Sequence, residues 1–347
     1  MVACADDARA PSALRAAQRI ANDTRVPWHE ILIGANGVAR AANTSDVYNA
    51  LKSVQFELEQ LPVDTSSRWL AQTMVNSRVD TRPRLHWALS VVPCDFSVFH
   101  FDARNTADPA YQAYATEPWY RDSKRIVHRG FKSGTGCHVE AIRGVLAWLL
   151  QGARSYSHLW LLDNDMDFRL FSFEAFRALV AYRRPLVCQP AMLAGKRGAR
   201  ATDRQSLRFQ PDPQHMAGRA RITDIVHRVP MDDVDNQPLI DRALFAPLAA
   251  ALETLDSRHQ VAQAQALNII ARALATASGT KRPAGLVFDW VPLIHMDTRL
   301  LGWGARAYSL KNGTACPRVP RIPGSHIGNW SEAARPAIEA LAREPCR

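Results

Sequence analysis

The sequence lacks the features that mark several specialised classes of protein. Its longest relevant apolar run, at residues 145–150, is far shorter than the roughly 20 residues that cross a bilayer, so we expect no transmembrane helix. Asp6 and Asp7 stand where a signal peptide carries a basic flank and an apolar stretch, so we expect no secretion signal. Entry into the secretory lumen would need a longer N-terminus, and the sequence leaves the compartment open.

Paired cysteines and glycine-rich phosphate loops are also missing. The six cysteines stand singly, without the Cys-x-x-Cys spacing of zinc and redox sites. We expect free thiols or small buried residues, with one or two disulfides as the alternative. No P-loop, Gly-x-Gly-x-x-Gly or Gly-x-Ser-x-Gly motif occurs, which argues against an NTPase, a Rossmann dehydrogenase and a serine hydrolase.

Acidic residues are in the minority. The chain has 43 Lys and Arg against 33 Asp and Glu, which gives a net charge of +10. A basic balance suits nucleic acid, anionic membranes or phosphorylated small molecules without choosing among them. The densest basic cluster, which includes Arg197, lies in a segment at about 194–220 that we expect to be a mobile loop. A solvated loop is the simpler interpretation and a flap facing phosphate groups is the alternative; nucleic acid is not expected, because no aromatic residues interleave at stacking intervals.

Short strand-like and helical stretches alternate from about residue 65 onwards. This alternation indicates an α/β fold in which a mostly parallel central sheet is flanked by helices. Residues 1–64 are Ala-rich and polar, and we interpret them as a partly helical extension outside the main core, with residues 65–347 as the main domain. The expected strands are 69–75, 96–101, 157–162, 185–188, 222–229 and 285–294, and the expected helices are 47–61, 83–91, 139–149, 173–182, 239–255, 260–275 and 331–342.

The strongest chemical signal is a buried strand that runs directly into three acids, Asp163, Asp165 and Asp167. In open α/β sheets, ligands bind just beyond the carboxyl ends of the strands. Several carboxylates placed there are costly without a compensating cation, and their hard oxygen ligands suit Mg²⁺ and Mn²⁺. Two alternatives stay open: a polar turn that caps the next helix, and a calcium loop, although Phe168 stands where such a loop needs glycine.

Several blocks of the sequence resemble GT-A-fold glycosyltransferases. An apolar strand followed by Asp-x-Asp is similar to the metal-binding signature of those enzymes, which use nucleotide-sugar donors. Together with that strand, the blocks that carry the resemblance are 96–102, 130–132, 237–242 and 292–303. In this order they resemble an uncharacterised family with a GT-A-like, Rossmann-type core. The resemblance covers roughly residues 68–304 and leaves residues 1–64 outside.

The resemblance implies a set of metal and donor ligands. Asp163 and Asp165 would hold Mn²⁺ or Mg²⁺, with Asp167 close behind. These enzymes commonly add a late histidine to the metal, and His295 lies where that residue is expected, after a strand near the end of the domain. The alternatives are a structural role for His295, and His326 as the ligand. Lys132, Asp163 and Arg197 would face the diphosphate of the nucleotide-sugar, and the acceptor would be a carbohydrate or glycoconjugate.

The catalytic base is the least defined part of this assignment. An inverting enzyme needs a carboxylate that deprotonates the acceptor hydroxyl. The first candidates are Asp233 and Asp235 in the acidic group before Pro238, with Asp241 and Asp256 as fallbacks. The acid pair that usually opens a helix in the family is not clearly present. Inverting and retaining mechanisms therefore both stay open, as do two other functions: a catalytically inactive nucleotide- or glycan-binding protein on the same fold, and a basic nucleic-acid-binding protein.

Overall fold

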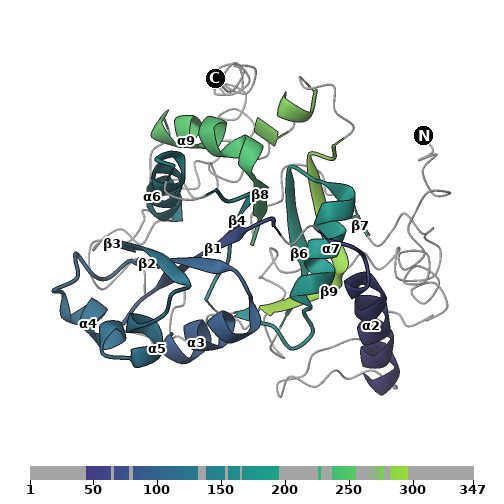
Figure 1. Ribbon diagram of the computed structural model, residues 1–347, viewed down its shortest axis with the longest axis horizontal. Coiled ribbons are helices and arrows are strands. Elements are labelled where there is room, and N and C mark those ends of the chain that lie inside the picture. The colour runs from purple at the N-terminus through teal and green to yellow at the C-terminus, as the bar shows by residue number, and fades with distance from the viewer. Residues whose placement is uncertain are drawn as a thin grey trace, which may run out of the picture.

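A computed structural model gives the arrangement of the chain. It describes residues 44–63, 66–77, 81–131, 138–152, 155–164, 166–194, 226–227, 237–254, 267, 270–271, 273–276 and 282–295. These residues form an α/β structure around one nine-stranded sheet, with helices packed on its faces (Figure 1).

The sheet is mostly parallel. Its strands are β1 (Trp69–Val75), β2 (Asp95–His100), β3 (Ile126–Phe131), β4 (His158–Leu161), β5 (Met166–Asp167), β6 (Val187–Ala194), β7 (Val226–His227), β8 (Leu239–Asp241) and β9 (Gly285–His295). Their spatial order is β3-β2-β1-β4-β8-β6-β9-β5, with β7 beside β9. Strands β1 to β4, β6 and β9 run in one direction, whereas β8, β5 and β7 pair antiparallel with their neighbours. The predicted α/β class with a mostly parallel sheet is confirmed.

The helices connect these strands and cover the sheet. They are α2 (Thr44–Glu59), α3 (Arg82–Val91), α4 (Pro109–Ala115), α5 (Pro118–Arg121), α6 (His138–Leu150), α7 (Phe173–Arg183) and α9 (Phe245–Thr254). Local sequence fixes several ends. Helices α3, α4 and α5 carry proline in their first turn, where a missing N–H costs nothing. In α7, Ser172 Oγ accepts a hydrogen bond from the Ala175 N–H, and Arg184 ends the helix in a left-handed conformation.

The buried faces of the sheet are apolar. Trp160 of β4 is fully buried and contacts Phe171, Phe173 and Phe176 at ring-centroid distances of 5.4–6.5 Å. These phenylalanines belong to α7 or to the turn before it, so α7 is held on that face by aromatic packing. Helix α6 packs against β1 and β3 and against α9.

Two expectations about the elements are wrong. The segment at 239–255 is not helical throughout, because Leu239–Asp241 is strand β8, inserted between β4 and β6. Asp241 Oδ1 accepts a hydrogen bond from the Ala243 N–H, so the helical turns begin only after this residue. The helix near residues 47–61 exists as α2, but it does not lie outside the main core: Leu51, Val54 and Leu58 are buried in the common core cluster. A short apolar stripe cannot be buried by a lone helix, and here α7 and β9 cover it.

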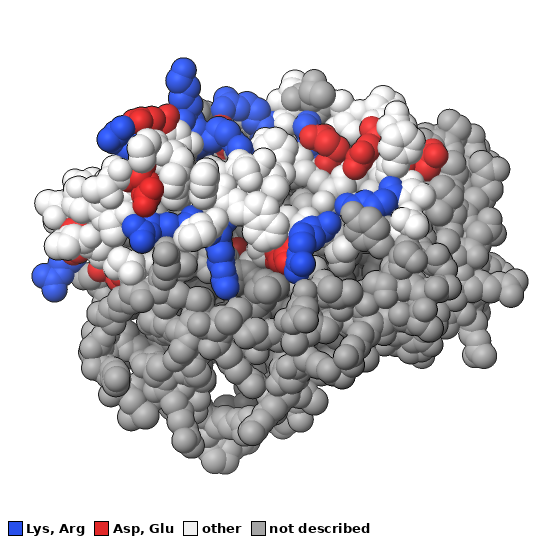
Figure 2. Space-filling model, turned by 90° about the horizontal axis from the view of Figure 1, so that it is seen from below, with Lys and Arg blue, Asp and Glu red and all other residues white. Residues whose placement is uncertain are grey.

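Other features agree with the expectations or lie outside the described residues. Within the described part of the chain, no helix has the length and hydropathy needed to cross a membrane. Cys94 and Cys188 are free and buried, and the other cysteines lie outside that part. The same is true of the helix expected at 331–342 and of nearly all of the basic segment at 194–220. On the face shown in Figure 2, Lys and Arg side chains are interspersed with Asp and Glu side chains.

Candidate functional site

The order of the strands creates a switch point between β1 and β4. From β1 the chain moves outward through β2 and β3, and it then returns to place β4 on the other side of β1. Ligands of open α/β sheets bind in the crevice that such a reversal leaves at the carboxyl ends of the strands. The chain follows β1 with Asn76 and Ser77, and it follows β4 with Asp163 and Asn164. The acidic segment therefore begins at the expected binding edge.

Hydrogen bonds fix the start of this acidic segment against β1. The Leu162 N–H donates to the Gln72 carbonyl at 2.8 Å, and Asn164 Nδ2 donates to the Met74 carbonyl. Because both acceptors are main-chain atoms of β1, the segment leaves β4 along a defined path. The polar residue between the acids thus positions the loop.

Gln237 holds Asp163 from the other side. Its side-chain Oε1 accepts a hydrogen bond from the Asp163 N–H, and its carbonyl accepts one from Trp160 Nε1 at 3.0 Å. Gln237 is buried and has φ 63°, a left-handed conformation that costs a non-glycine residue free energy and often marks functional sites. Among the described residues, none donates a hydrogen bond to the Asp163 carboxylate. The main chain of Asp163 is therefore fixed while its carboxylate stays accessible to a ligand.

Asp167 is placed differently from Asp163. It lies in β5 with 5% of its side chain exposed, and Arg169 binds both of its oxygens. The Arg169 Nε donates at 2.6 Å and the Arg169 main-chain N–H at 2.9 Å. An adjacent guanidinium already compensates this charge, so Asp167 is less suited than Asp163 to bind a metal ion.

The late histidine comes to the same part of the sheet. Strand β9 ends at His295, and β5 pairs with it so that Met166 is opposite His295 and Asp167 is opposite Ile294. Met166 separates Asp165 from Asp167 in the sequence. The main chain of His295 therefore lies beside the acidic segment, although strands β6, β7 and β8 lie between the two in the sequence.

Several predicted site residues fall outside the described part of the chain. These are Asp165, Lys132, Arg197, Asp233, Asp235, Asp256 and His326, together with the side chain of His295. Within the described part, no three His, Cys, Asp or Glu side chains come together as a metal site. Of the predicted ligands, only the side chains of Asp163 and Asp167 can be compared directly.

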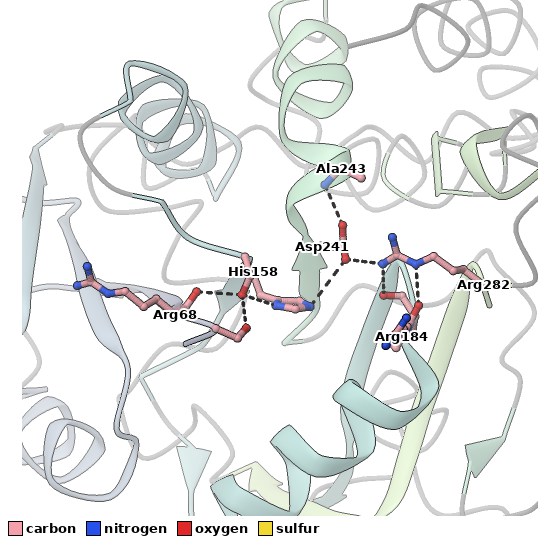
Figure 3. A network of polar contacts seen from close by, with 9 residues as sticks. Arg68, His158, Arg184, Asp241, Ala243 and Arg282 are labelled. Carbon is pink, nitrogen blue, oxygen red and sulfur yellow. Dashed lines mark hydrogen bonds and ion pairs between the residues drawn. The ribbon is translucent and has the colours of Figure 1, made fainter. Parts of the chain in front are cut away.

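Asp241 does not belong to this site. It pairs with His158 at the start of β4, whereas Asp163 follows the end of β4. Its carboxylate binds Arg282 and the Ala243 N–H and lies 3.9 Å from His158 Nε2 (Figure 3). The fallback assignment of Asp241 as the catalytic base is therefore wrong, because β8 runs antiparallel and carries this residue to the opposite edge of the sheet.

A further acid at the binding edge had no assigned role in the sequence. Asp102 follows β2, and its Oδ2 accepts hydrogen bonds from the Ser77 N–H at 2.8 Å and from Ser77 Oγ at 2.6 Å. Its Oδ1 is buried and has no hydrogen-bond partner among the described residues. A buried acceptor without a partner is uncommon and costs free energy. The sequence shows Asp102 only as an acid that follows an apolar strand. It does not indicate that Ser77 donates both of its hydrogen bonds to Oδ2 and none to Oδ1.

A buried aromatic layer supports this edge beneath Asp102. His100, the last residue of β2, lies against Tyr111, Tyr114 and Phe131, and its Nε2 is 2.7 Å from the Tyr120 hydroxyl. Burial, assisted by Arg129, lowers the pKa of His100 to about 3, so its ring is neutral near pH 7. His100 thus acts in packing and hydrogen bonding without adding positive charge.

No protein-family model matches the chain, and no curated protein matches it either. The residues at the switch point therefore carry the functional conclusion.

Proposed function

We propose that the protein is a metal-dependent glycosyltransferase with a GT-A-like core, which moves a sugar from a nucleotide-diphosphate donor to an acceptor hydroxyl. The observation that carries this proposal is the register of β5 and β9, which brings the main chain of His295 beside the Asp163–Asp167 segment. The acids and a histidine that are far apart in the sequence are thereby brought to one edge of the sheet.

The donor set suits the proposed ion. Carboxylates and a neutral imidazole are good ligands for Mn²⁺, and carboxylates alone suit Mg²⁺. Asp163, with its fixed main chain and a carboxylate to which no described residue donates a hydrogen bond, would be a ligand together with Asp165 and His295. The bound ion would stabilise the negative charge that grows on the departing nucleoside diphosphate.

Other residues would bind and orient the substrates. Lys132 and Arg197 would face the diphosphate. In an inverting reaction, Asp233 or Asp235 would take the proton of the acceptor hydroxyl while the acceptor oxygen bonds to the sugar C1 and the bond from C1 to the diphosphate breaks.

Binding of nucleoside diphosphates with and without Mn²⁺ tests this function. We expect UDP or GDP to bind in a calorimeter only when Mn²⁺ is present, and Asp165→Asn to remove this binding. Asp122→Asn is a matched control, because Asp122 is exposed and pairs with Arg121 away from the switch point. Metal-independent binding, or equal losses in the two variants, would overturn the proposal.

The second candidate is a protein that binds nucleotides or glycans without transferring a sugar. It is favoured by one observation: Asp241, the one described acid among those considered as the base, is bound by Arg282 at the opposite edge of the sheet and is not available at the acidic segment. Nucleoside diphosphate release from a panel of nucleotide-sugars separates the two candidates. Release that disappears in Asp165→Asn indicates a transferase, and metal-dependent binding without release across donors and acceptors indicates the binding protein.

A further inference from the structure

Gln237 has an unusual main-chain conformation for its place in the sequence. Its φ is 63°, in the left-handed region that residues other than glycine rarely adopt. It also precedes Pro238, and the residue before a proline normally has an extended conformation with negative φ. The other described non-glycine residue with positive φ, Arg184, ends helix α7, where this conformation is common. Gln237 lies just before strand β8, so contacts with other segments are needed to compensate the cost of its conformation.

Two hydrogen bonds compensate this cost, and both hold the end of β4. The Gln237 carbonyl accepts a hydrogen bond from Trp160 Nε1 at 3.0 Å, and Gln237 Oε1 accepts one from the Asp163 N–H at 2.5 Å. Trp160 is fully buried against three phenylalanine rings, which makes it a rigid anchor for the Gln237 main chain. Gln237 therefore connects a fixed point of the core to the first acid of the segment.

The side chain of Gln237 extends the pairing of β4 with β8 beyond its last main-chain bond. That last bond runs from the Leu161 N–H to the Pro238 carbonyl, at 2.9 Å. Beyond it, the acceptor for the Asp163 N–H is a side-chain oxygen and not a main-chain carbonyl. The position of the Asp163 main chain therefore depends on which residue stands at position 237, whereas a main-chain bond would form with almost any residue there.

Asp163 is a ligand in the proposed metal site, and Gln237 bonds to its main chain only. No described residue donates a hydrogen bond to the Asp163 carboxylate. The place of this carboxylate is therefore set by the main chain that carries it. Partners that orient a metal ligand without touching the ion typically contribute about 10–100-fold to metal affinity.

We propose that Gln237 is a positioning residue of the metal site, which keeps the Asp163 carboxylate in place for the ion by holding the Asp163 N–H. This inference rests on the proposed function, because it needs the metal ion that the function requires. Gln237 itself binds neither the ion nor the nucleotide. Loss of its side-chain acceptor therefore weakens metal binding only while Asp163 is present.

Titration of the full chain with MnCl₂, followed by the electron paramagnetic resonance signal of free Mn²⁺, tests this role. Gln237→Leu removes the acceptor and should weaken Mn²⁺ binding by roughly 10–100-fold. Gln237→Asn is the milder variant: asparagine tolerates a left-handed φ, but its amide is one methylene shorter and should also weaken binding. Urea denaturation of each variant shows whether it is folded under the conditions of the titration.

Gln55→Leu is the matched control. It makes the same substitution at another buried glutamine, whose side chain bonds to the Leu170 and Trp290 carbonyls and not to Asp163. It should lower the stability of the protein and leave Mn²⁺ binding almost unchanged. Equal losses of binding in Gln237→Leu and Gln55→Leu would overturn the inference, because they would indicate a general response to lower stability.

A double variant tests whether Gln237 acts through Asp163. Asp163→Asn should weaken Mn²⁺ binding, and Gln237→Leu added to it should cause no further loss, because two residues that act through one contact are not additive. A further loss of the same size as in the single variant would show that Gln237 acts elsewhere, against the inference.

The same titrations separate this inference from the proposed function. If the unmodified protein binds Mn²⁺ and both Gln237 variants bind it equally well, only the role of Gln237 is wrong. The absence of Mn²⁺ binding by the unmodified protein would overturn the proposed function and this role together.

Discussion

Met166 of β5 is the main-chain partner of His295 at the end of β9. The strand that contains Met166 is only two residues long, and its position immediately after Asp165 is what links the acidic segment to the late histidine. A short antiparallel pair of this kind sets which residues of β9 can reach the acids. The register therefore brings the main chain of His295 beside the acidic segment, which is what the proposed metal site requires.

Replacement of His295 by alanine tests this relationship. We expect His295→Ala to weaken Mn²⁺-dependent binding of UDP or GDP by roughly 10–100-fold, which is the loss seen even for residues that only support a metal ligand. Calorimetry in the presence of Mn²⁺ measures the effect. The control is His326→Ala, which removes the alternative ligand. If His326→Ala causes the loss and His295→Ala does not, the assignment of His295 is incorrect.

The acids of the segment should separate into two groups with opposite effects. Asp167→Asn weakens a buried ion pair with Arg169, so it should lower the free energy of unfolding by about 1–3 kcal/mol and leave nucleotide binding almost unchanged. Asp165→Asn should abolish metal-dependent binding with little effect on stability. Urea denaturation and calorimetry on both variants measure the two effects. A loss of binding in Asp167→Asn at full stability would show that Asp167 is itself a ligand.

Part of the first half of the fold could be predicted because its signals are local, whereas β3, α4 and α5 were not predicted. Residues 159–162 are a continuous apolar run and most of 69–75 is apolar, while α3 carries proline in its first turn and α7 begins after the Ser172 cap. The position of the acids after β4 followed from the same pattern. These features depend on neighbouring residues in the chain, so the sequence alone carries them.

The parts that could not be predicted depend on contacts between distant segments. Leu239–Asp241 has no strand-like length of its own and becomes β8 only because β4 and β6 pair with it on both sides. The left-handed φ of Gln237 and the unused oxygen of Asp102 likewise arise from hydrogen bonds to Trp160, Asp163 and Ser77. No periodicity or motif in the sequence encodes these pairings.

Gln55 should be needed for the attachment of α2 to the rest of the protein. Its Nε2 donates to the Leu170 carbonyl at 2.7 Å and to the Trp290 carbonyl at 3.0 Å, and the residue is 1% exposed. Gln55→Leu leaves these carbonyls without their donor, so it should lower the free energy of unfolding by about 1–3 kcal/mol. Urea denaturation measures the change. Phe56→Ser, at a neighbouring position that is 59% exposed, should change it by no more than about 0.5 kcal/mol. Equal stability of Gln55→Leu and the unmodified protein would mean that α2 is only loosely attached.

The stability of the protein should fall as the pH is lowered from 7 to 5, because His158 is buried in its neutral form. Burial lowers the pKa of His158 from 6.5 to about 4, with Asp241 opposing and Arg282 assisting this shift (Figure 3). As the pH falls below 6.5, the unfolded chain takes up a proton that the folded protein does not bind until about pH 4. Stability is therefore complete above pH 6.5 and is lost through the window from 6.5 to 4, at roughly 2 kcal/mol between pH 7 and 5. Urea denaturation at these two pH values measures the free energy of unfolding. His158→Gln should lose less of it between pH 7 and 5 than the unmodified protein. The loss that remains in the variant should come from His100, whose pKa is lowered in the same direction. The same loss in both proteins would show that His158 is protonated in the folded state near pH 6.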